Sequence, residues 1–130
     1  MLIDNKLLDQ VTEQANENER LRMNYNLHDS LDTKTQLLLN VLEPGTILPI
    51  HRHRHTAETY IVLRGSINII FYDDSKTPVL QNLDNSKEGD YGVHIPSGQW
   101  HTLEVKESGT VIFEVKDGPY KPLGEEDVLK

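Results

Sequence analysis

Hydrophobic residues near the start of the chain follow two different periods. Leu7, Val11 and Ala15 recur at helical spacing. Asp4, just before them, is of a residue type that favours the N-cap of a helix. From residue 21 to residue 28, apolar and polar residues instead alternate, which is the period of a half-buried strand. The pattern predicts one short helix, a polar linker ending near residue 19, and then a strand.

Beyond residue 35, apolar β-forming residues occur in short runs that are separated by turn-forming pairs such as Pro44-Gly45. The runs cover residues 36–42, 59–63, 66–72, 91–95, 101–106 and 110–116. Many short strands at even spacing favour an all-β sandwich or barrel. Residues 118–122 contain two prolines and are not expected to form a central strand.

Composition narrows the class of protein. A chain of 130 residues is the size of one domain. Its net charge of −8 does not favour binding to nucleic acid, whose phosphates are also negative. The absence of cysteine excludes disulfides, thiolate catalysis, iron–sulfur clusters and cysteine-based zinc sites. No apolar run is long enough for a membrane span, and no signal peptide is recognisable, so we expect a cytoplasmic protein.

Histidine is the residue type that points to chemistry. His51 and His53 are two positions apart, so on a strand their side chains lie on the same face, about 6.5 Å apart along the axis. Glu58 has the opposite parity, and residues 54–57 must bend to bring it beside them. His55 falls in this bend, and we expect it to be exposed or to lie outside the inner ligand set.

A further ligand is expected from a distant strand. His101 is the best candidate, because it begins an apolar run just after a turn. A histidine-rich loop that takes up metal adventitiously would not need it. Imidazoles and a carboxylate around one point form a site for a first-row divalent ion, with zinc, iron, manganese and nickel as the candidates.

Two motifs resemble those of the cupin superfamily. The first is Gly45-x5-His51-x-His53-x4-Glu58-x6-Gly65, and the second is Gly89-x6-Pro96-x-Gly98-x2-His101. The second has one extra residue before Pro96, and Val105 replaces its usual asparagine. The resemblance implies an all-β, cupin-type double-stranded β-helix (jelly-roll barrel) preceded by a short N-terminal helix. We expect the helix and linker in residues 1–19, one barrel with an added N-terminal strand in 20–122, and a tail in 123–130.

A narrower resemblance is to the WbuC family of cupin-fold metalloproteins. The segments that carry it include Arg20-Leu21-Arg22-x-Asn24-x-Asn26-Leu27-His28-Asp29-Ser30, His51-Arg52-His53, Trp100-His101-Thr102 and Phe113-Glu114-Val115-Lys116-x-Gly118-Pro119-Tyr120. That family is associated with surface-polysaccharide gene clusters in bacteria. The resemblance implies a small polar metabolite, a sugar or nucleotide sugar, as the ligand. Because cupins commonly form dimers, it also implies a homodimer.

Polar residues on the first predicted strand are candidates for binding the ligand. They are Arg22, Asn24, Asn26 and His28, and they share one face of the strand. Either this face is exposed to solvent, or it forms a pocket wall, in which case His28 is also a catalytic candidate. Asn40 interrupts an apolar run and is either a structural clamp or a ligand contact.

The last predicted strand leaves two alternatives for Glu114 and Lys116. If Val111, Phe113 and Val115 pack in the core, these two are surface charges, which is the commoner outcome. If the barrel interior receives Glu114, it becomes a candidate catalytic base, and Lys116 on the same face becomes a candidate ligand contact.

Two aromatic residues complete the candidate set. Tyr60 shares strand parity with Glu58, and Trp100 adjoins His101, where it either stacks on a sugar ring or packs in the core. The function expected is a metal-dependent isomerase, epimerase or lyase acting on a sugar-derived metabolite in polysaccharide biosynthesis. The alternatives are a non-catalytic, metal-dependent carbohydrate-binding or sensing module, a ferrous dioxygenase and a purely structural metal site.

Overall fold

Helix α1 (Asn5–Glu17) is the first element of the computed structural model, which describes residues 1–84 and 89–129. The Asp4 side chain caps it by accepting a hydrogen bond of 3.0 Å from the backbone N–H of Leu7. The residues that α1 buries, Leu8, Val11 and Ala15, are spaced as one helical face. The predicted helix is confirmed. Within the described residues, no helix is long and apolar enough to cross a membrane.

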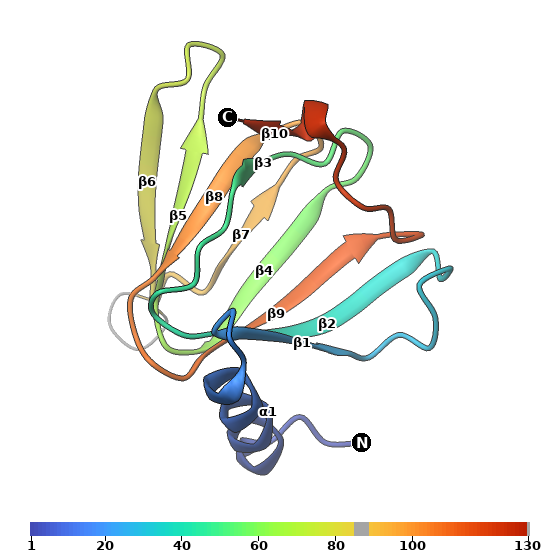
Figure 1. The fold of residues 1–130 in the computed structure, drawn as a ribbon, viewed down its shortest axis with the longest axis vertical. Helices are drawn as coiled ribbons and strands as arrows, with labels where there is room; N and C mark the ends of the chain where they lie inside the picture. Colours follow the sequence, from blue (N-terminus) through green and yellow to red (C-terminus); the bar gives the residue numbers. More distant parts are fainter. Residues whose placement is uncertain (85–88, 130) are drawn as a thin grey trace.

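In the part of the chain that the structure describes, ten strands form two antiparallel sheets that face each other (Figure 1). The first sheet is ordered β1 (Arg22–Asn26), β2 (Thr35–Leu42), β9 (Thr110–Asp117), β4 (Glu58–Arg64) and β7 (Gly92–Ile95). The second is ordered β10 (Val128–Leu129), β3 (Ile50–His51), β8 (Trp100–Val105), β5 (Ile67–Tyr72) and β6 (Pro78–Leu83). A short 3-10 helix, η1 (Glu125–Asp127), precedes β10. The predicted all-β jelly-roll class with one short N-terminal helix is confirmed.

Three of these strands are absent from the sequence prediction. Strand β6 begins with a proline at a sheet edge and is exposed along most of its length, so it shows no alternation of buried and exposed positions. Strands β3 and β10 have two residues each and carry no period of their own. The segment that we expected to be a tail therefore adds a strand to the second sheet, where Val128 lies opposite His51.

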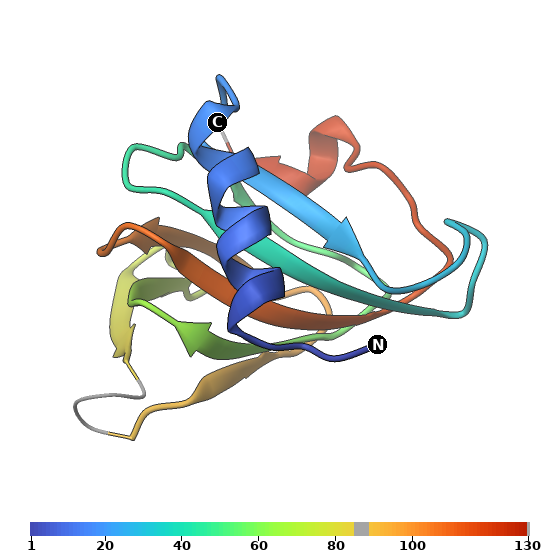
Figure 2. The same cartoon turned by 90° about the horizontal axis from the view of Figure 1, so that it is seen from below.

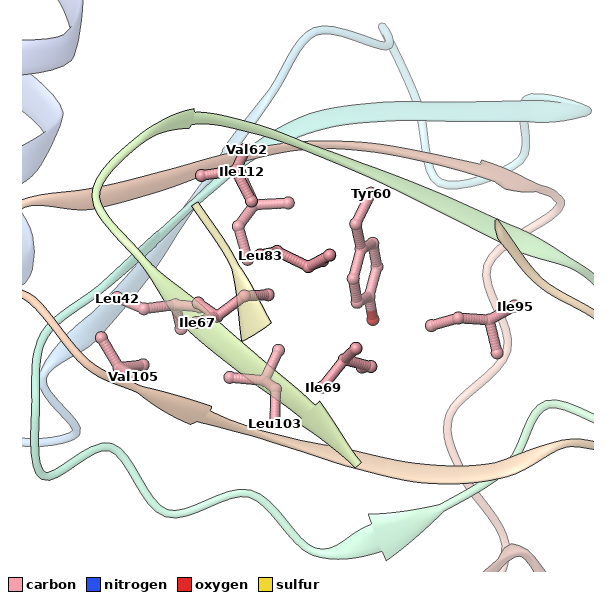
Figure 3. Packing of buried hydrophobic residues seen from close by; sticks show 10 residues of the cluster. All are labelled: Leu42, Tyr60, Val62, Ile67, Ile69, Leu83, Ile95, Leu103, Val105 and Ile112. Atoms are coloured by element: carbon pink, nitrogen blue, oxygen red, sulfur yellow. The ribbon is translucent and has the colours of Figure 1, made fainter. Parts of the chain in front are cut away.

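The two faces of the first sheet pack against different elements. Its inner face and that of the second sheet enclose one apolar cluster (Figure 3), made of Leu42, Tyr60, Val62, Ile67, Ile69, Leu83, Ile95, Leu103, Val105 and Ile112. On the outer face, α1 covers β1, β2 and β9 (Figure 2), where it packs on Leu39, Val41 and Val111 together with Met23, Tyr25 and Phe113. Ile61 and Leu63 of β4 stay exposed on this face. Because α1 takes this face of β9, the alternate residues of that strand point into the barrel.

This arrangement corrects the more common expectation for Glu114. With Val111 and Phe113 under the helix, Glu114 faces inward and only 7% of its surface is exposed. Treating it as a surface charge is therefore wrong.

The turn between β4 and β5 provides a stability prediction. Gly65 has φ +83°, and a Cβ there would overlap the Thr110 side chain and come within 2.7 Å of its Cα. We expect Gly65→Ala to lower the free energy of unfolding by about 3 kcal/mol, the sum of a steric clash and a left-handed backbone. Gly98 has φ +81° but nothing within 4 Å of the added carbon, so Gly98→Ala should cost only about 1 kcal/mol. Urea unfolding measures both, and equal costs would contradict the close approach at Thr110.

Candidate metal centre

Three imidazole rings from two strands and a loop meet at one end of the barrel. His51 of β3 lies directly opposite His101 of β8 in the sheet register, and their ring centroids are 4.3 Å apart. The His53 ring lies 5.3 Å from that of His51 and 6.3 Å from that of His101. His51 and His101, 50 positions apart in the chain, are neighbours because β3 and β8 pair.

A buried carboxylate joins these rings. The chain bends after His53 and returns as β4, whose first residue is Glu58, only 3% exposed. Glu58 Oε1 lies 3.0 Å from His53 Nε2 and 3.6 Å from His101 Nε2. Ligand atoms of His51, His53 and Glu58 all lie within 4.8 Å of one another. Ligands of one first-row ion lie about 2.0–2.2 Å from it, so small side-chain adjustments suffice for this group to hold one.

Backbone carbonyls orient two of the rings. The Nδ1 atom of His51 lies 2.9 Å from the carbonyl oxygen of Pro49, and that of His101 lies 2.8 Å from the carbonyl oxygen of Gln99. Because a carbonyl oxygen only accepts, Nδ1 carries the hydrogen in each ring and Nε2 presents its lone pair. His101 Nε2 is buried and has no hydrogen-bond partner among the described residues. A cation between the rings would satisfy it.

The charge states of the cluster also suit a cation. Burial is the largest cause, and repulsion from His101 the second, of a pKa of His51 that is lowered to about 4. This ring is therefore neutral at neutral pH. Burial also lowers the pKa of His101. For Glu58, burial favours the neutral acid, but the hydrogen bond from His53 and the nearby imidazoles outweigh it and lower the pKa to about 2. A carboxylate and neutral imidazoles are the forms that bind a divalent metal.

A second carboxylate lies beside the cluster, inside the barrel. Glu114 of β9 is directly opposite Tyr60 of β4, and the Tyr60 hydroxyl donates a hydrogen bond of 3.2 Å to Glu58 Oε2. The Asn40 amide donates to Glu114 Oε1 at 3.4 Å. Burial and the charge of Glu58 raise the pKa of Glu114 to about 7, and burial raises that of Tyr60. Asn40, Tyr60 and Glu114, which the sequence suggested on separate grounds, thus lie in one polar network with the candidate ligand Glu58.

The polar face of β1 lies at the open edge of the same sheet. Asn24 is opposite Asn40 in the register, so it shares the inner face, yet both Asn24 and Asn26 are exposed. His28 extends the pairing to β2, since its Nδ1 lies 3.1 Å from the backbone nitrogen and 3.0 Å from the carbonyl oxygen of Leu37. Arg22 is half-buried at the start of the strand. These contacts do not join the four residues to the histidine cluster.

Of the remaining candidate residues, Lys116 lies beside the histidine cluster, whereas Trp100 points away from it. Lys116 lies opposite Glu58 in the register of β9 and β4, next to the cluster. Trp100 adjoins His101 in β8 and therefore points to the other face of the sheet, where the Arg52 guanidinium lies 4.5 Å from its ring. His55 is exposed, as expected.

The C-terminal segment contributes contacts beside the site that no sequence pattern predicts. Asp127 Oδ1 accepts hydrogen bonds from Arg52 Nε at 3.2 Å and from Arg54 Nε at 2.7 Å. Residues 118–124 run from the end of β9 in one sheet towards β10 in the other (Figure 1), beside the residues that carry His53. No short-range signal marks such a pairing, since the partners are more than 70 positions apart in the sequence.

The fold of this protein is similar to that of several solved structures, one of which is described as a cupin domain. Similar solved structures include a mutant of Bacillus subtilis oxalate decarboxylase OxdC and the capsular polysaccharide assembling protein CapF from Staphylococcus aureus, each 18% identical with a TM-score of 0.57. Each match covers 77% of this chain but only 30% of the other. The Cnp3 cupin domain of Schizosaccharomyces pombe is 12% identical over 74% of this chain and 64% of its own, with a TM-score of 0.56. At these identities the likeness establishes the fold alone.

The family is given by the sequence itself. Residues 3–83 match the family described as a domain of unknown function, DUF6016, and the chain belongs to that family. Among curated proteins, none matches the sequence.

Proposed function

We propose that this cupin is a divalent-metal-dependent enzyme that acts on a small sugar-derived metabolite as an isomerase, epimerase or lyase. His51, His53 and Glu58 would hold the ion, with His101 as the fourth ligand. Zinc, iron, manganese and nickel all accept this set of nitrogen and oxygen donors. When bound, such an ion supplies Lewis-acid polarisation of a carbonyl group or of water.

The position of Glu114 is the observation that carries this proposal. A binding module or a structural metal site needs no second buried carboxylate beside its ligands, whereas proton transfer at a substrate carbon does need a base. Glu114 occupies that position, and the Asn40 amide holds it by donating to Oε1. The Tyr60 hydroxyl donates a hydrogen bond to Glu58 Oε2 and holds it in place, while Glu58 Oε1 lies next to His53.

The sugar setting has separate support. The WbuC-like segments quoted above favour a role in surface-polysaccharide biosynthesis, and one of the structures with a similar fold is named as a capsular polysaccharide assembling protein. A nucleotide sugar or a free sugar is the ligand this setting favours. We also propose that the protein is a cytoplasmic homodimer, since cupins commonly pair and the sheet edge at β1 is open.

A metal analysis combined with a substrate screen tests the proposal. The protein is stripped with a chelator, reloaded separately with Zn²⁺, Fe²⁺, Mn²⁺ or Ni²⁺, and incubated in D₂O without oxygen with sugars and nucleotide sugars. We expect at least one loaded form to bind one ion per chain and to incorporate deuterium at a carbon of one compound, which NMR detects. Binding without exchange or product would contradict catalysis. In a parallel incubation of the Fe²⁺-loaded protein in air, turnover that is absent without oxygen would indicate a dioxygenase instead.

A further inference from the structure

A cavity of about 450 Å³ adjoins the candidate metal centre. One wall is formed by residues 52–56, which lead from β3 towards β4, and the other by the end of β9 and the segment after it, up to residue 127. His53 belongs both to the metal cluster and to this wall. A molecule in the cavity therefore has direct access to one of the candidate ligands.

The lining of the cavity is more positive than the rest of the protein. The chain as a whole carries a net charge of −8. The lining holds four cationic and three acidic side chains, namely Arg52, Arg54, Lys116, Lys121, Asp117, Glu126 and Asp127. A local excess of positive charge in an acidic protein favours a negatively charged ligand at this place.

Lys116 is the cation best placed to meet such a ligand. Both arginines are already bonded to the Asp127 carboxylate, at 3.2 Å and 2.7 Å. Lys116 is half-buried, lies opposite Glu58 in the register and lines the cavity. No ion pair or hydrogen bond joins its ammonium group to another residue in the described part of the chain, and the Tyr120 ring lies 5.9 Å away. The carboxylates of Glu58 and Glu114 attract the ammonium group from beyond ion-pair distance. Lys121, the other lysine of the lining, is exposed.

We infer that the cavity binds the anionic group of the metabolite, a carboxylate or a phosphate, on Lys116, while another part of the same molecule reaches the metal centre. The inference rests on the proposed function for the metal side of the site. A half-buried ammonium donates a charge-assisted hydrogen bond to an anion, and a neutral sugar has no charged acceptor to receive it. The substrate class is then a sugar acid or a sugar phosphate, and the fixed anion orients the reacting carbon between the metal ligands and Glu114.

Calorimetric titration of metal-loaded protein at constant ionic strength tests the inference with three probes. Malonate carries carboxylates, malonamide is its neutral counterpart, and inorganic phosphate represents the other anion class. We expect the wild-type protein to bind malonate or phosphate at least about tenfold more tightly than malonamide. Lys116→Met should weaken this binding about tenfold, and the preferred anion distinguishes a carboxylate from a phosphate.

Lys106→Met is the matched control. It removes the same charge from an exposed lysine of the chain that pairs with Glu104 at 3.3 Å and does not line the cavity. We expect it to bind both anions as the wild type does, and both variants to keep their metal. No preference for anions over malonamide, or equal weakening in the two variants, would overturn the inference and leave the metal-dependent reaction standing. Lys116-dependent anion binding in a protein that shows no metal-dependent turnover would instead overturn the proposed function alone.

Discussion

The double variant His51→Ala/His53→Ala should lose stoichiometric metal. Both rings contribute to the group whose ligand atoms lie within 4.8 Å of one another, so their removal leaves Glu58 and His101 as the only members of the candidate set. A residue that only hydrogen-bonds to a metal ligand, without contacting the ion, contributes about 10- to 100-fold to metal affinity. We therefore expect the removal of two ligands to lower the metal affinity by more than about a thousandfold. Competition with a chromogenic chelator and elemental analysis after dialysis measure it.

His55→Ala provides the matched control for this variant. His55 lies in the same segment but is exposed, so its replacement should leave the metal content unchanged. Circular dichroism and urea unfolding of all variants separate the loss of ligands from the loss of structure. A double variant that folds and still holds one ion per chain would show that the ligand assignment is wrong.

Glu114→Gln should abolish most of the turnover and leave the metal in place. Glutamine keeps the size of the side chain and an oxygen that accepts from Asn40, but it does not accept a proton from the substrate. Loss of a general base lowers the rate by about 10²- to 10⁴-fold. The measurement is the rate of solvent deuterium exchange with the compound found by the screen, together with metal content.

Glu104→Gln is the control for this second variant. Glu104 is an exposed carboxylate in β8 that accepts a hydrogen bond from Asn68 at 3.1 Å, away from the cluster. Its replacement should not change the exchange rate. If Glu114→Gln exchanges deuterium as fast as the wild type and Glu104→Gln do, Glu114 is not the base and the case for catalysis loses its main support.

The sequence predicted the parts of the site that depend on local periodicity and motif spacing. Strand parity predicted that His51 and His53 share one face; in the structure β3 ends at His51 and His53 follows it in a loop, yet the two rings lie close together. The motif spacing added Glu58 and His101. The direction of Glu114 could not be predicted in this way. In β9 both faces carry apolar residues, and the choice between them depends on α1, whose packing partner is set by the tertiary structure.

The C-terminal part of the cavity was missed for a related reason. Strand β10 has only two residues, and its pairing with β3 exists because the chain returns across the barrel. The contacts of Asp127 with Arg52 and Arg54 join positions that no local pattern relates. The alternation of apolar and polar residues indicates which face of a strand is buried, but it does not indicate which other element packs against that face.

The most direct test of the metal centre is an anomalous difference map from a crystal of the metal-loaded protein, recorded at the absorption edge of the bound ion. We expect one peak per chain between β3, β4 and β8, about 2.0–2.2 Å from nitrogen atoms of His51 and His53 and from an oxygen of Glu58. A peak at the protein surface, or none between these side chains in protein that carries one ion per chain, would contradict the account.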